Sequence, residues 1–222
     1  MKREIFITED GSHSLFVPEL DEHFHSTHGA MQESMHVFIK NGLQETSEEE
    51  LVIFEVGFGT GLNALLTLAN ACGRKIRYIS IEKYPLSETE YQGLNHAQQL
   101  DSSLQEDFML MHQSPWNEWV NITENFQLLK LEADFCQVDY RALPLFNLIY
   151  FDAFAPNKQD EMWAEENFQQ LAAHCAEGAR FVTYCAQGEV RRKLTRCGFS
   201  MQRVPGPPMK REMLVGLKKT VA

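Results

Sequence analysis

The sequence has no stretch that approaches the ~18 uninterrupted apolar residues needed for a membrane-spanning helix. Its start, Met1-Lys2-Arg3-Glu4, leads directly into a strand-like run, without the apolar segment of a secretion signal. These two absences predict a soluble protein of the cytoplasm with no membrane partner. With 222 residues, of which 44% are hydrophobic, the chain can build the core of one domain with a small extension.

Cysteines are few and irregularly spaced. The five cysteines are odd in number, and no two of them form a Cys-x-x-Cys pair. We therefore expect buried thiols rather than a disulfide framework or a structural zinc site. His23, His25 and His28 lie close together in sequence, but no cysteine or acidic residue completes a metal-ligand pattern. We expect no metal and interpret this segment as a polar loop whose role the sequence leaves open.

Basic residues are scarce in most of the chain and concentrated at its end. Residues 1–179 carry 10 Lys and Arg against 29 Asp and Glu, a net charge of −19. Residues 180–222 carry 10 Lys and Arg against two acidic residues, a net charge of +8. Such asymmetry is typical of proteins with a polyanion-binding face, but a solvated basic end would have the same charges.

The expected elements alternate between strand and helix. Residues 5–7 and 15–17 flank Asp10-Gly11, a hairpin turn, and the apolar residues over 31–39 have helical spacing. A polar linker follows at residues 45–50. Further strands are expected at 51–56, 77–81, 126–131, 146–151, 179–184, 199–204 and 211–217, and helices at 63–72, 87–99, 161–176 and 190–197.

This alternation indicates an α/β fold with a mostly parallel sheet covered on both faces. The last two strands are too close in sequence for a crossover helix, so the last strand is predicted to be antiparallel. We predict a Rossmann-like, doubly wound domain over residues 51–222 with a hairpin-and-helix extension over residues 1–50. Residues 100–125 are predicted only as a polar region.

The strongest functional signal is Glu55-Val56-Gly57-Phe58-Gly59-Thr60-Gly61-Leu62-Asn63, where a buried strand leads through three alternating glycines into a helix. Glycine lets the backbone turn tightly and approach a ligand at the start of a helix. Leu62 stands where the dinucleotide fingerprint needs Gly or Ala, and the Lys-Ser/Thr of a P-loop is absent. The segment resembles motif I of class I S-adenosylmethionine-dependent methyltransferases. A purely structural turn is the alternative.

The resemblance implies that S-adenosyl-L-methionine is the cofactor and that residues of this segment bind it. These residues are Glu55, Gly57, Phe58, Gly59, Thr60, Gly61 and Asn63. Glu82 ends the next predicted strand, where a carboxylate can accept both ribose hydroxyls of a nucleoside. Asp134 follows the third strand, and in class I methyltransferases an acid here accepts from the adenine amino group. Glu132 or Asp139 could take that role instead.

A further acidic residue ends the fourth strand, in Phe151-Asp152-Ala153-Phe154-Ala155-Pro156. Ligands of open α/β sheets bind at the carboxyl ends of the strands, so Asp152 and Phe154 are predicted to line the pocket beside the sulfonium. A helix-capping role for Asp152 is the alternative, but Pro156 and the distance to Glu161 make it less natural.

Several segments together resemble a narrower family, the methyltransferase part of the bacterial tRNA 5-methylaminomethyl-2-thiouridine biosynthesis proteins (MnmC type). They are Glu33-Ser34-Met35-His36-Val37-Phe38, the glycine segment, the Asp152 segment with Glu161-Met162-Trp163, Gly188-Glu189-Val190-Arg191-Arg192, and Lys210-Arg211-Glu212-Met213-Leu214. Because the chain stops soon after Gly216, we expect the stand-alone MnmD-like form without the flavin-dependent oxidase domain.

The resemblance implies an enzyme that methylates the primary amine of 5-aminomethyl-2-thiouridine at the tRNA wobble position. Asp152 would be the catalytic residue that orients the nitrogen and receives its proton, and Phe154 would shape the pocket for the extruded base. The tRNA backbone would contact basic residues, namely Arg191, Arg192, Lys210 and Arg211.

Two other functions remain open from the sequence. One is an aminopropyl transferase of the polyamine-synthase type, and the other is a catalytically inert methyltransferase-like RNA-binding module. The basic end disfavours the first, because a polyamine substrate is itself cationic. The acids Glu82, Asp134 and Asp152 disfavour the second. The tRNA species, the enzyme that supplies the amine and the oligomeric state do not follow from the sequence.

Overall fold

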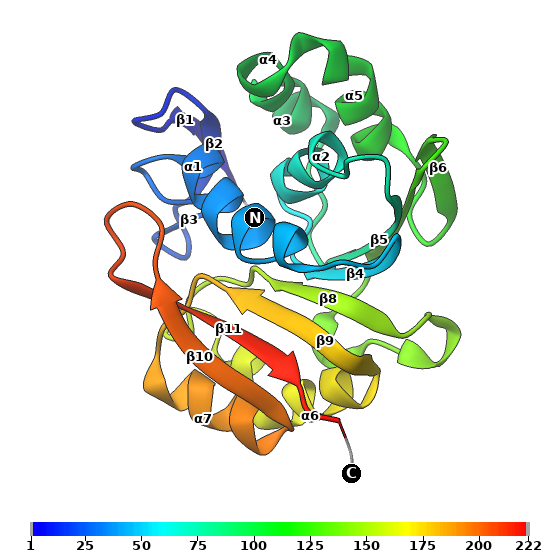
Figure 1. Cartoon of the computed structure of the whole chain (residues 1–222). Helices are drawn as coiled ribbons and strands as arrows, with labels where there is room; N and C mark the ends of the chain where they lie inside the picture. The colour runs from blue at the N-terminus through cyan, green and yellow to red at the C-terminus, as the bar shows by residue number, and fades with distance from the viewer. Residues whose placement is uncertain (1, 221–222) are drawn as a thin grey trace.

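The computed structural model describes residues 2–220 of the chain (Figure 1). Strand β4 (Glu50–Val56) is at the centre of its main sheet and buries side chains on both faces. Ile53 belongs to the hydrophobic core on one face, and Phe54 belongs to the core on the other. A strand that is apolar on both faces requires helices on both sides of the sheet, as parallel sheets have.

The main sheet has eight strands in the order β10-β11-β9-β8-β4-β5-β7-β6. Strands β9, β8, β4, β5 and β7 are parallel, and β11 runs antiparallel to both β9 and β10. The predicted doubly wound sheet with an antiparallel last strand is confirmed. The bounds of the other strands are β5 (Lys75–Glu82), β6 (Trp119–Thr123), β7 (Phe126–Glu132), β8 (Phe146–Phe151), β9 (Cys175–Thr183), β10 (Phe199–Pro205) and β11 (Glu212–Lys218).

Helices cover the two faces of this sheet (Figure 1). One face is packed by the N-terminal helices and α2, and the other by α6 and α7. The helices are α1 (Ala30–Ser34), the π-helix η1 (Met35–Lys40), α2 (Leu62–Ala69), α3 (Glu88–Gln92), α4 (His96–Leu100), α5 (Gln105–Gln113), α6 (Glu165–Ala173) and α7 (Gly188–Arg196). Short 3₁₀ turns are η2 (Leu43–Glu45), η3 (Ser102–Leu104), η4 (Phe135–Gln137), η5 (Tyr140–Ala142) and η6 (Asp160–Trp163). Across residues 2–220, no helix is long and apolar enough to span a membrane.

The N-terminal segment forms a small antiparallel sheet of β1 (Glu4–Ile7), β2 (His13–Val17) and β3 (Glu22–His23). The predicted hairpin is confirmed, whereas β3 was not predicted. The helix expected over residues 31–39 begins at Ala30 and continues as the π-helix to Lys40. Its apolar residues are buried in the core of the main sheet. The helical part of the extension therefore completes one helical layer, and the domain division at residue 50 stays a prediction.

Among the predicted helices, two differ most from the structure. The helix expected over 87–99 is divided into α3 and α4, with Gly93 between them. The helix expected over 161–176 ends at Ala173, because β9 begins at Cys175. Gly178, predicted to stop that helix, lies inside β9 with a φ of 74° at an irregularity in the pairing with β8. The apolar residues Phe168, Leu171 and Cys175 continue the helical spacing past the end of α6, which explains the error.

Candidate active site

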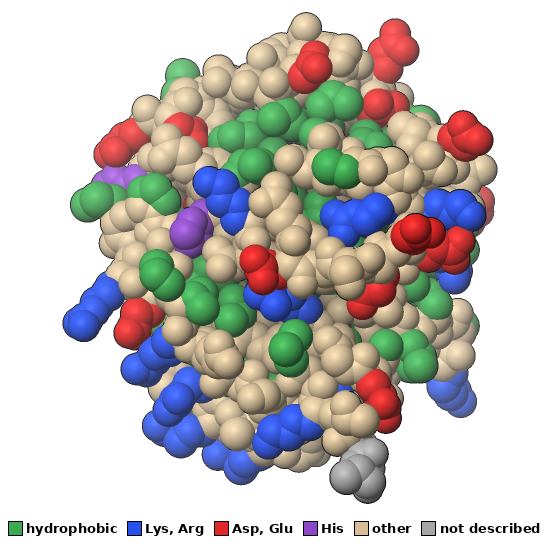
Figure 2. Space-filling model, viewed as in Figure 1, with side chains coloured by type: hydrophobic (Ala, Val, Ile, Leu, Met, Phe, Trp, Pro, Cys, Tyr) green, Lys and Arg blue, Asp and Glu red, His purple; other side chains and the backbone are tan. Residues whose placement is uncertain are grey.

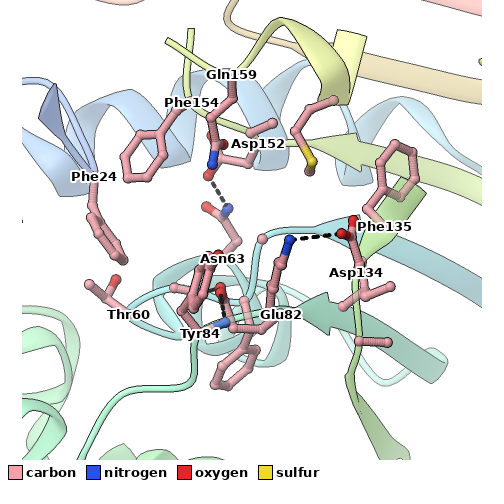
Figure 3. Close-up of a pocket in the computed structure, with 18 of the residues that line it drawn as sticks. Phe24, Thr60, Asn63, Glu82, Tyr84, Asp134, Phe135, Asp152, Phe154 and Gln159 are labelled. Carbon is pink, nitrogen blue, oxygen red and sulfur yellow. Dashed lines mark hydrogen bonds and ion pairs between the residues drawn. The ribbon is translucent and has the colours of Figure 1, made fainter. Parts of the chain in front are cut away.

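The carboxyl ends of β4, β5, β7 and β8 meet at one edge of the sheet, on the side where β1–β3 lie (Figure 1). The glycine segment follows β4, Glu82 ends β5, Asp134 follows β7, and Asp152 follows β8. These side chains line one cavity of about 970 Å³, a volume that includes its open mouth (Figure 3). The topology therefore brings together acids that are far apart in sequence.

Most residues predicted to bind the cofactor line this cavity. They are Gly57, Phe58, Gly59, Thr60, Asn63, Glu82, Asp134, Asp152 and Phe154. Glu55 and Gly61 are not among the lining residues. The side chain of Glu55 is buried beneath the cavity and accepts a hydrogen bond of 2.7 Å from Ser80 Oγ. A side chain at Gly61 would point toward His112. Neither residue is therefore part of the cavity wall, and their contact with the cofactor stays a prediction.

Two of the glycines are required by close approaches of the backbone. Gly57 has a φ of 92°, and a Cβ there would lie 3.1 Å from the carbonyl oxygen of Asp152. Gly59 has a φ of 49°, and a Cβ there would lie 3.2 Å from the ring of Phe24. Larger residues would be strained in this conformation and would push the neighbouring segments away. Glycine thus lets the β4 loop, the β8 loop and the N-terminal segment meet around the cavity.

Glu82 is fixed at the cavity wall by two backbone groups. Its Oε2 accepts from the amide of Gly59 at 3.1 Å, and its Oε1 accepts from the amide of Tyr84 at 2.8 Å. A carboxylate offers about four acceptor positions, so the side chain retains capacity to accept from a ligand. Glu82 therefore both ties the glycine loop to β5 and presents a carboxylate to the cavity.

The sequence offered Asp134, Glu132 and Asp139 as acceptors for the adenine amino group. Of these three, Asp134 lines the cavity. Its Oδ2 accepts from Lys83 Nζ at 2.8 Å, and its Oδ1 accepts from the amide of Cys136 at 2.9 Å. The hydrogen bond from Lys83 keeps the pKa of Asp134 below its usual value. The alternative Asp139 instead pairs with Arg141 at 2.7 Å, and Glu132 is exposed.

Asp152 lines the cavity beside Asn63 (Figure 3). Asn63 Nδ2 donates to Asp152 Oδ2 at 2.8 Å, and the amide of Asp152 donates to the carbonyl of Val56 at 3.1 Å. Burial raises the pKa of Asp152 to about 7, although the hydrogen bond from Asn63 opposes this shift. A carboxyl group with such a pKa can exchange a proton near neutral pH.

The loop after β8 is held rigidly from two sides. Trp163 Nε1 donates to the carbonyl of Phe154 at 2.8 Å, and the Tyr184 hydroxyl donates to the carbonyl of Ala153 at 2.9 Å. The ring of Phe154 meets that of Phe24 edge to face, with centroids 5.3 Å apart. The cavity wall near Asp152 is therefore aromatic and well supported.

The sequence did not reveal that the N-terminal segment contributes to this cavity. Arg3, Phe24 and His25 are lining residues from that segment. Nδ1 of His25 and the Ser14 hydroxyl share a hydrogen bond of 2.9 Å, and burial lowers the pKa of His25 to about 4. The imidazole is therefore neutral at pH 7. Tyr84, Phe135, Gln159 and Met162 also line the cavity without having been predicted.

The three neighbouring histidines turn to different partners. His23 packs against Phe6 and Phe16, His25 faces the cavity, and His28 bonds to Glu9 at 2.9 Å. Over the described residues 2–220, no group of three or more His, Cys, Asp or Glu side chains is arranged to hold a metal ion.

The predicted tRNA-binding residues do not form one cluster. Arg191 and Arg192 line a groove along α7 together with Arg196 and Lys219. Basic side chains gather at the lower left of Figure 2, where α7 lies in the same view of Figure 1. Lys210 instead pairs with the largely buried Glu33 at 2.5 Å. Arg211 is exposed on the loop between β10 and β11.

The residues that line the cavity fit S-adenosyl-L-methionine, the cofactor that the sequence implied. Glu82 offers a carboxylate for a ribose, and the ring of Phe135 and the side chain of Met162 offer apolar surface for a base. The buried hydroxyl of Thr60 has no hydrogen-bond partner within the protein, so a polar ligand group would satisfy it. The cavity thus combines nucleoside-binding groups with a carboxyl group of near-neutral pKa.

Comparison with known proteins agrees with this geometry. The sequence profile of a family described as S-adenosyl-L-methionine-dependent methyltransferase matches residues 97–219. The chain is 32% identical over 221 residues to the tRNA 5-methylaminomethyl-2-thiouridine biosynthesis bifunctional protein MnmC of Paraburkholderia xenovorans, covering 90% of this chain and 33% of that protein. It is 34% identical over 221 residues to MnmC of Pseudoalteromonas atlantica, covering 89% of this chain and 31% of that protein. The chain thus spans about a third of the length of these relatives.

Solved structures give the same result. The crystal structure of MNMC2 from Aquifex aeolicus is 25% identical, with a TM-score of 0.76, covering 99% of this chain and 72% of that one. A methyltransferase from Pyrococcus furiosus is 14% identical, with a TM-score of 0.50 over 80% of both chains, and supports the fold alone. The fold and the resemblance to MnmC-type methyltransferases predicted from the sequence are confirmed.

Proposed function

We propose that this chain, which belongs to the S-adenosyl-L-methionine-dependent methyltransferase family, methylates the primary amine of 5-aminomethyl-2-thiouridine at the tRNA wobble position. The product would be 5-methylaminomethyl-2-thiouridine. Similarity to relatives named for this biosynthesis supports the substrate. The observation that carries the chemistry is the Asp152 carboxyl, whose pKa is raised to about 7 and which lines the same cavity as Glu82 and Asp134. A tRNA substrate would fit a cytoplasmic location.

The cofactor supplies, when bound, a methyl group on a positively charged sulfur. Glu82 would accept from the two ribose hydroxyls, and Asp134 from the adenine amino group beside the ring of Phe135. The Thr60 hydroxyl would hydrogen-bond to the polar amino-acid end. These contacts would hold the donor beside Asp152, and such positioning can lower a barrier by ~7–11 kcal/mol.

Asp152 would prepare the acceptor nitrogen. An aminomethyl group arrives largely as an ammonium ion, which has no lone pair for bond formation. The Asp152 carboxylate would accept its proton, and the pKa of about 7 suits this exchange at neutral pH. Asn63 would hold the carboxylate in place through the Nδ2 hydrogen bond.

The aromatic wall and the basic helix would bind the RNA. A wobble base has to leave its stack to reach the methyl group, and the rings of Phe24 and Phe154 would pack against the extruded base. Arg191 and Arg192 on α7 and the exposed Arg211 would contact phosphates. Lys210 could do so only by giving up its pair with Glu33.

Methyl transfer to defined acceptors tests this proposal. The protein is incubated with methyl-labelled S-adenosyl-L-methionine and tRNA that carries 5-aminomethyl-2-thiouridine, and nucleosides are identified by mass spectrometry. We expect label in 5-methylaminomethyl-2-thiouridine and none in tRNA that lacks the aminomethyl group. A parallel reaction with decarboxylated cofactor and putrescine examines the aminopropyl transferase alternative. Product there, or no transfer in either reaction, would refute the proposal.

A further inference from the structure

Beneath the Asn63–Asp152 hydrogen bond lies a layer of buried polar atoms. Glu55 on β4 is 1% exposed, and its Oε2 accepts from Ser80 Oγ at 2.7 Å. Three other atoms in this layer are buried and have no hydrogen-bond partner. They are Glu55 Oε1, Asn63 Oδ1 and the Tyr78 hydroxyl. Unpaired buried polar atoms are costly, so a cluster of three requires an explanation.

The groups around Glu55 come from every element that packs on it. Ser80 and Tyr78 belong to β5, and Asn63 lies in the first turn of α2. Tyr150 belongs to β8, and Asp152 follows it. Asp152 is the one group among these that can carry a charge near pH 7, and this charge is negative. A carboxylate at Glu55 would therefore be buried without a cation and beside a second carboxyl group. Burial accordingly raises the pKa of Glu55 to about 8.

A neutral carboxyl group has one hydrogen-bond donor, whereas a carboxylate has none. Asn63 is close enough to Glu55 to influence its pKa, and the unpaired Glu55 Oε1 and Asn63 Oδ1 are both buried in this layer. Its Nδ2 already donates to Asp152, so its Oδ1 is the atom that needs a donor. If the amide were turned over, Oδ1 would face the carboxyl oxygen of Asp152 and repel it.

We propose that Glu55 is a positioning residue, whose neutral carboxyl group donates to Asn63 Oδ1 and thereby holds Nδ2 toward Asp152. Glu55 acts on Asp152 only through Asn63, because its own side chain does not line the cavity. This role explains why a buried strand carries the acidic residue Glu55 at the start of the glycine segment. It rests on the catalytic part proposed for Asp152.

Other charges also act on Asp152 and stay constant in the test. Glu33 from α1 raises its pKa, Lys210 from the β10–β11 loop lowers it, and Tyr184 follows β9 nearby. None of these is altered by a substitution at Glu55. Glu55→Gln and Glu55→Leu both remove the Glu55 carboxyl group, so a difference between these two variants in the titration of Asp152 would report the orientation of Asn63.

The test compares Glu55→Gln with Glu55→Leu in the full chain. Gln keeps a neutral donor and an acceptor for Ser80, whereas Leu has a similar size and neither. Carbon-13 NMR of the side-chain carboxyl groups, recorded against pH without added cofactor, follows Glu55 and Asp152 directly. Single-turnover methyl transfer to aminomethyl-bearing tRNA and calorimetric binding of the cofactor are measured on the same variants.

We expect Glu55 in the parent to be neutral at pH 7. Glu55→Gln should leave the titration midpoint of the Asp152 carboxyl near pH 7. Its single-turnover rate of methyl transfer should stay within about threefold of the parent rate. Glu55→Leu should raise this midpoint by about one pH unit and lower the rate at pH 7 by about tenfold, with cofactor affinity unchanged. An ionised Glu55 at pH 7, or an unchanged Asp152 midpoint in Glu55→Leu, overturns the proposal. If Glu55→Leu does not fold, the parent titration and a slow Glu55→Gln variant can still overturn it. The titrations do not depend on which acceptor the enzyme uses.

Discussion

Asn63 donates a hydrogen bond of 2.8 Å from its Nδ2 to Oδ2 of Asp152, and so joins the start of α2 to the end of β8. The bond links the carboxyl group of the proposed proton acceptor to a side chain of the glycine segment. It favours the ionised form of Asp152, which burial alone would suppress. The activity of the site at neutral pH should therefore depend on Asn63.

Replacing Asn63 by Ala should shift the pH dependence of methyl transfer to higher pH. Without the donor, the pKa of Asp152 should rise by about one unit, since a hydrogen bond to a charged group contributes ~1.5–3 kcal/mol. The ionised carboxylate is the acting form, so the rate at pH 7 should fall and recover partly by pH 9. Single-turnover rates from pH 6 to 9 measure this shift. Asn70→Ala, at the other end of α2, is the control and should keep the parent profile. An unshifted profile for Asn63→Ala would contradict this role.

Glu82→Ala should weaken cofactor binding by about tenfold to a hundredfold, because two ribose hydroxyls lose a charged acceptor and the glycine loop loses an anchor at the Gly59 amide. Calorimetric titration with S-adenosyl-L-methionine gives the affinity directly. Glu132→Ala is a matched control, since Glu132 is the register partner of Glu82 on β7 but does not line the cavity. Equal affinities for the two variants would show that Glu82 does not hold the ribose.

Arg191→Glu and Arg192→Glu should weaken tRNA binding and reduce its salt dependence. Each lost phosphate contact should flatten the log–log slope by roughly 0.7–0.9. Cofactor affinity should stay the same, because the groove beside α7 is separate from the cavity. Arg141→Glu alters an arginine outside that groove and serves as the control. Affinities and slopes equal to those of the parent would indicate that α7 is only a solvated face.

Glu55→Gln should be more stable than the parent at pH 7 and about equally stable at pH 4. The pKa of Glu55 is raised from 4.5 to about 8 on folding, so between these values the unfolded chain releases a proton that the folded chain keeps. The free energy of unfolding of the parent should therefore fall as the pH rises through this window and level off above it. The gain for Gln should be on the order of 3 kcal/mol at pH 7 and near zero at pH 4. Urea unfolding at both values tests this, and a pH-independent difference would mean that Glu55 is ionised in the folded protein.

Much of the site could be predicted because parallel strands end at a common edge. The positions of Glu82, Asp134 and Asp152 directly after buried strands were enough to place them around one cavity. The glycine segment also predicted a loop that approaches these acids. These features depend on local sequence and on the order of strands, which the pattern of apolar residues reveals.

The contribution of Phe24 and His25 could not be predicted in this way. Their approach to the cavity depends on how the N-terminal sheet packs on the loops after β4 and β8, which no local pattern records. The surroundings of the Glu55 side chain could not be predicted for a related reason. Its motif suggested a ligand contact, but the alternation along β4 turns its side chain into the layer beneath the cavity. Helix α5 and strand β6 were missed because their apolar residues lack a clear helical or strand period.

The single-turnover rate of Asp152→Asn tests the central claim most directly. The substitution keeps the size of the side chain but removes its ability to accept a proton. We predict that methyl transfer to aminomethyl-bearing tRNA falls by about a hundredfold or more at pH 7, while the affinity for S-adenosyl-L-methionine stays within about twofold of the parent. A rate equal to that of the parent from pH 6 to 9 would contradict the assignment of Asp152 as the proton acceptor.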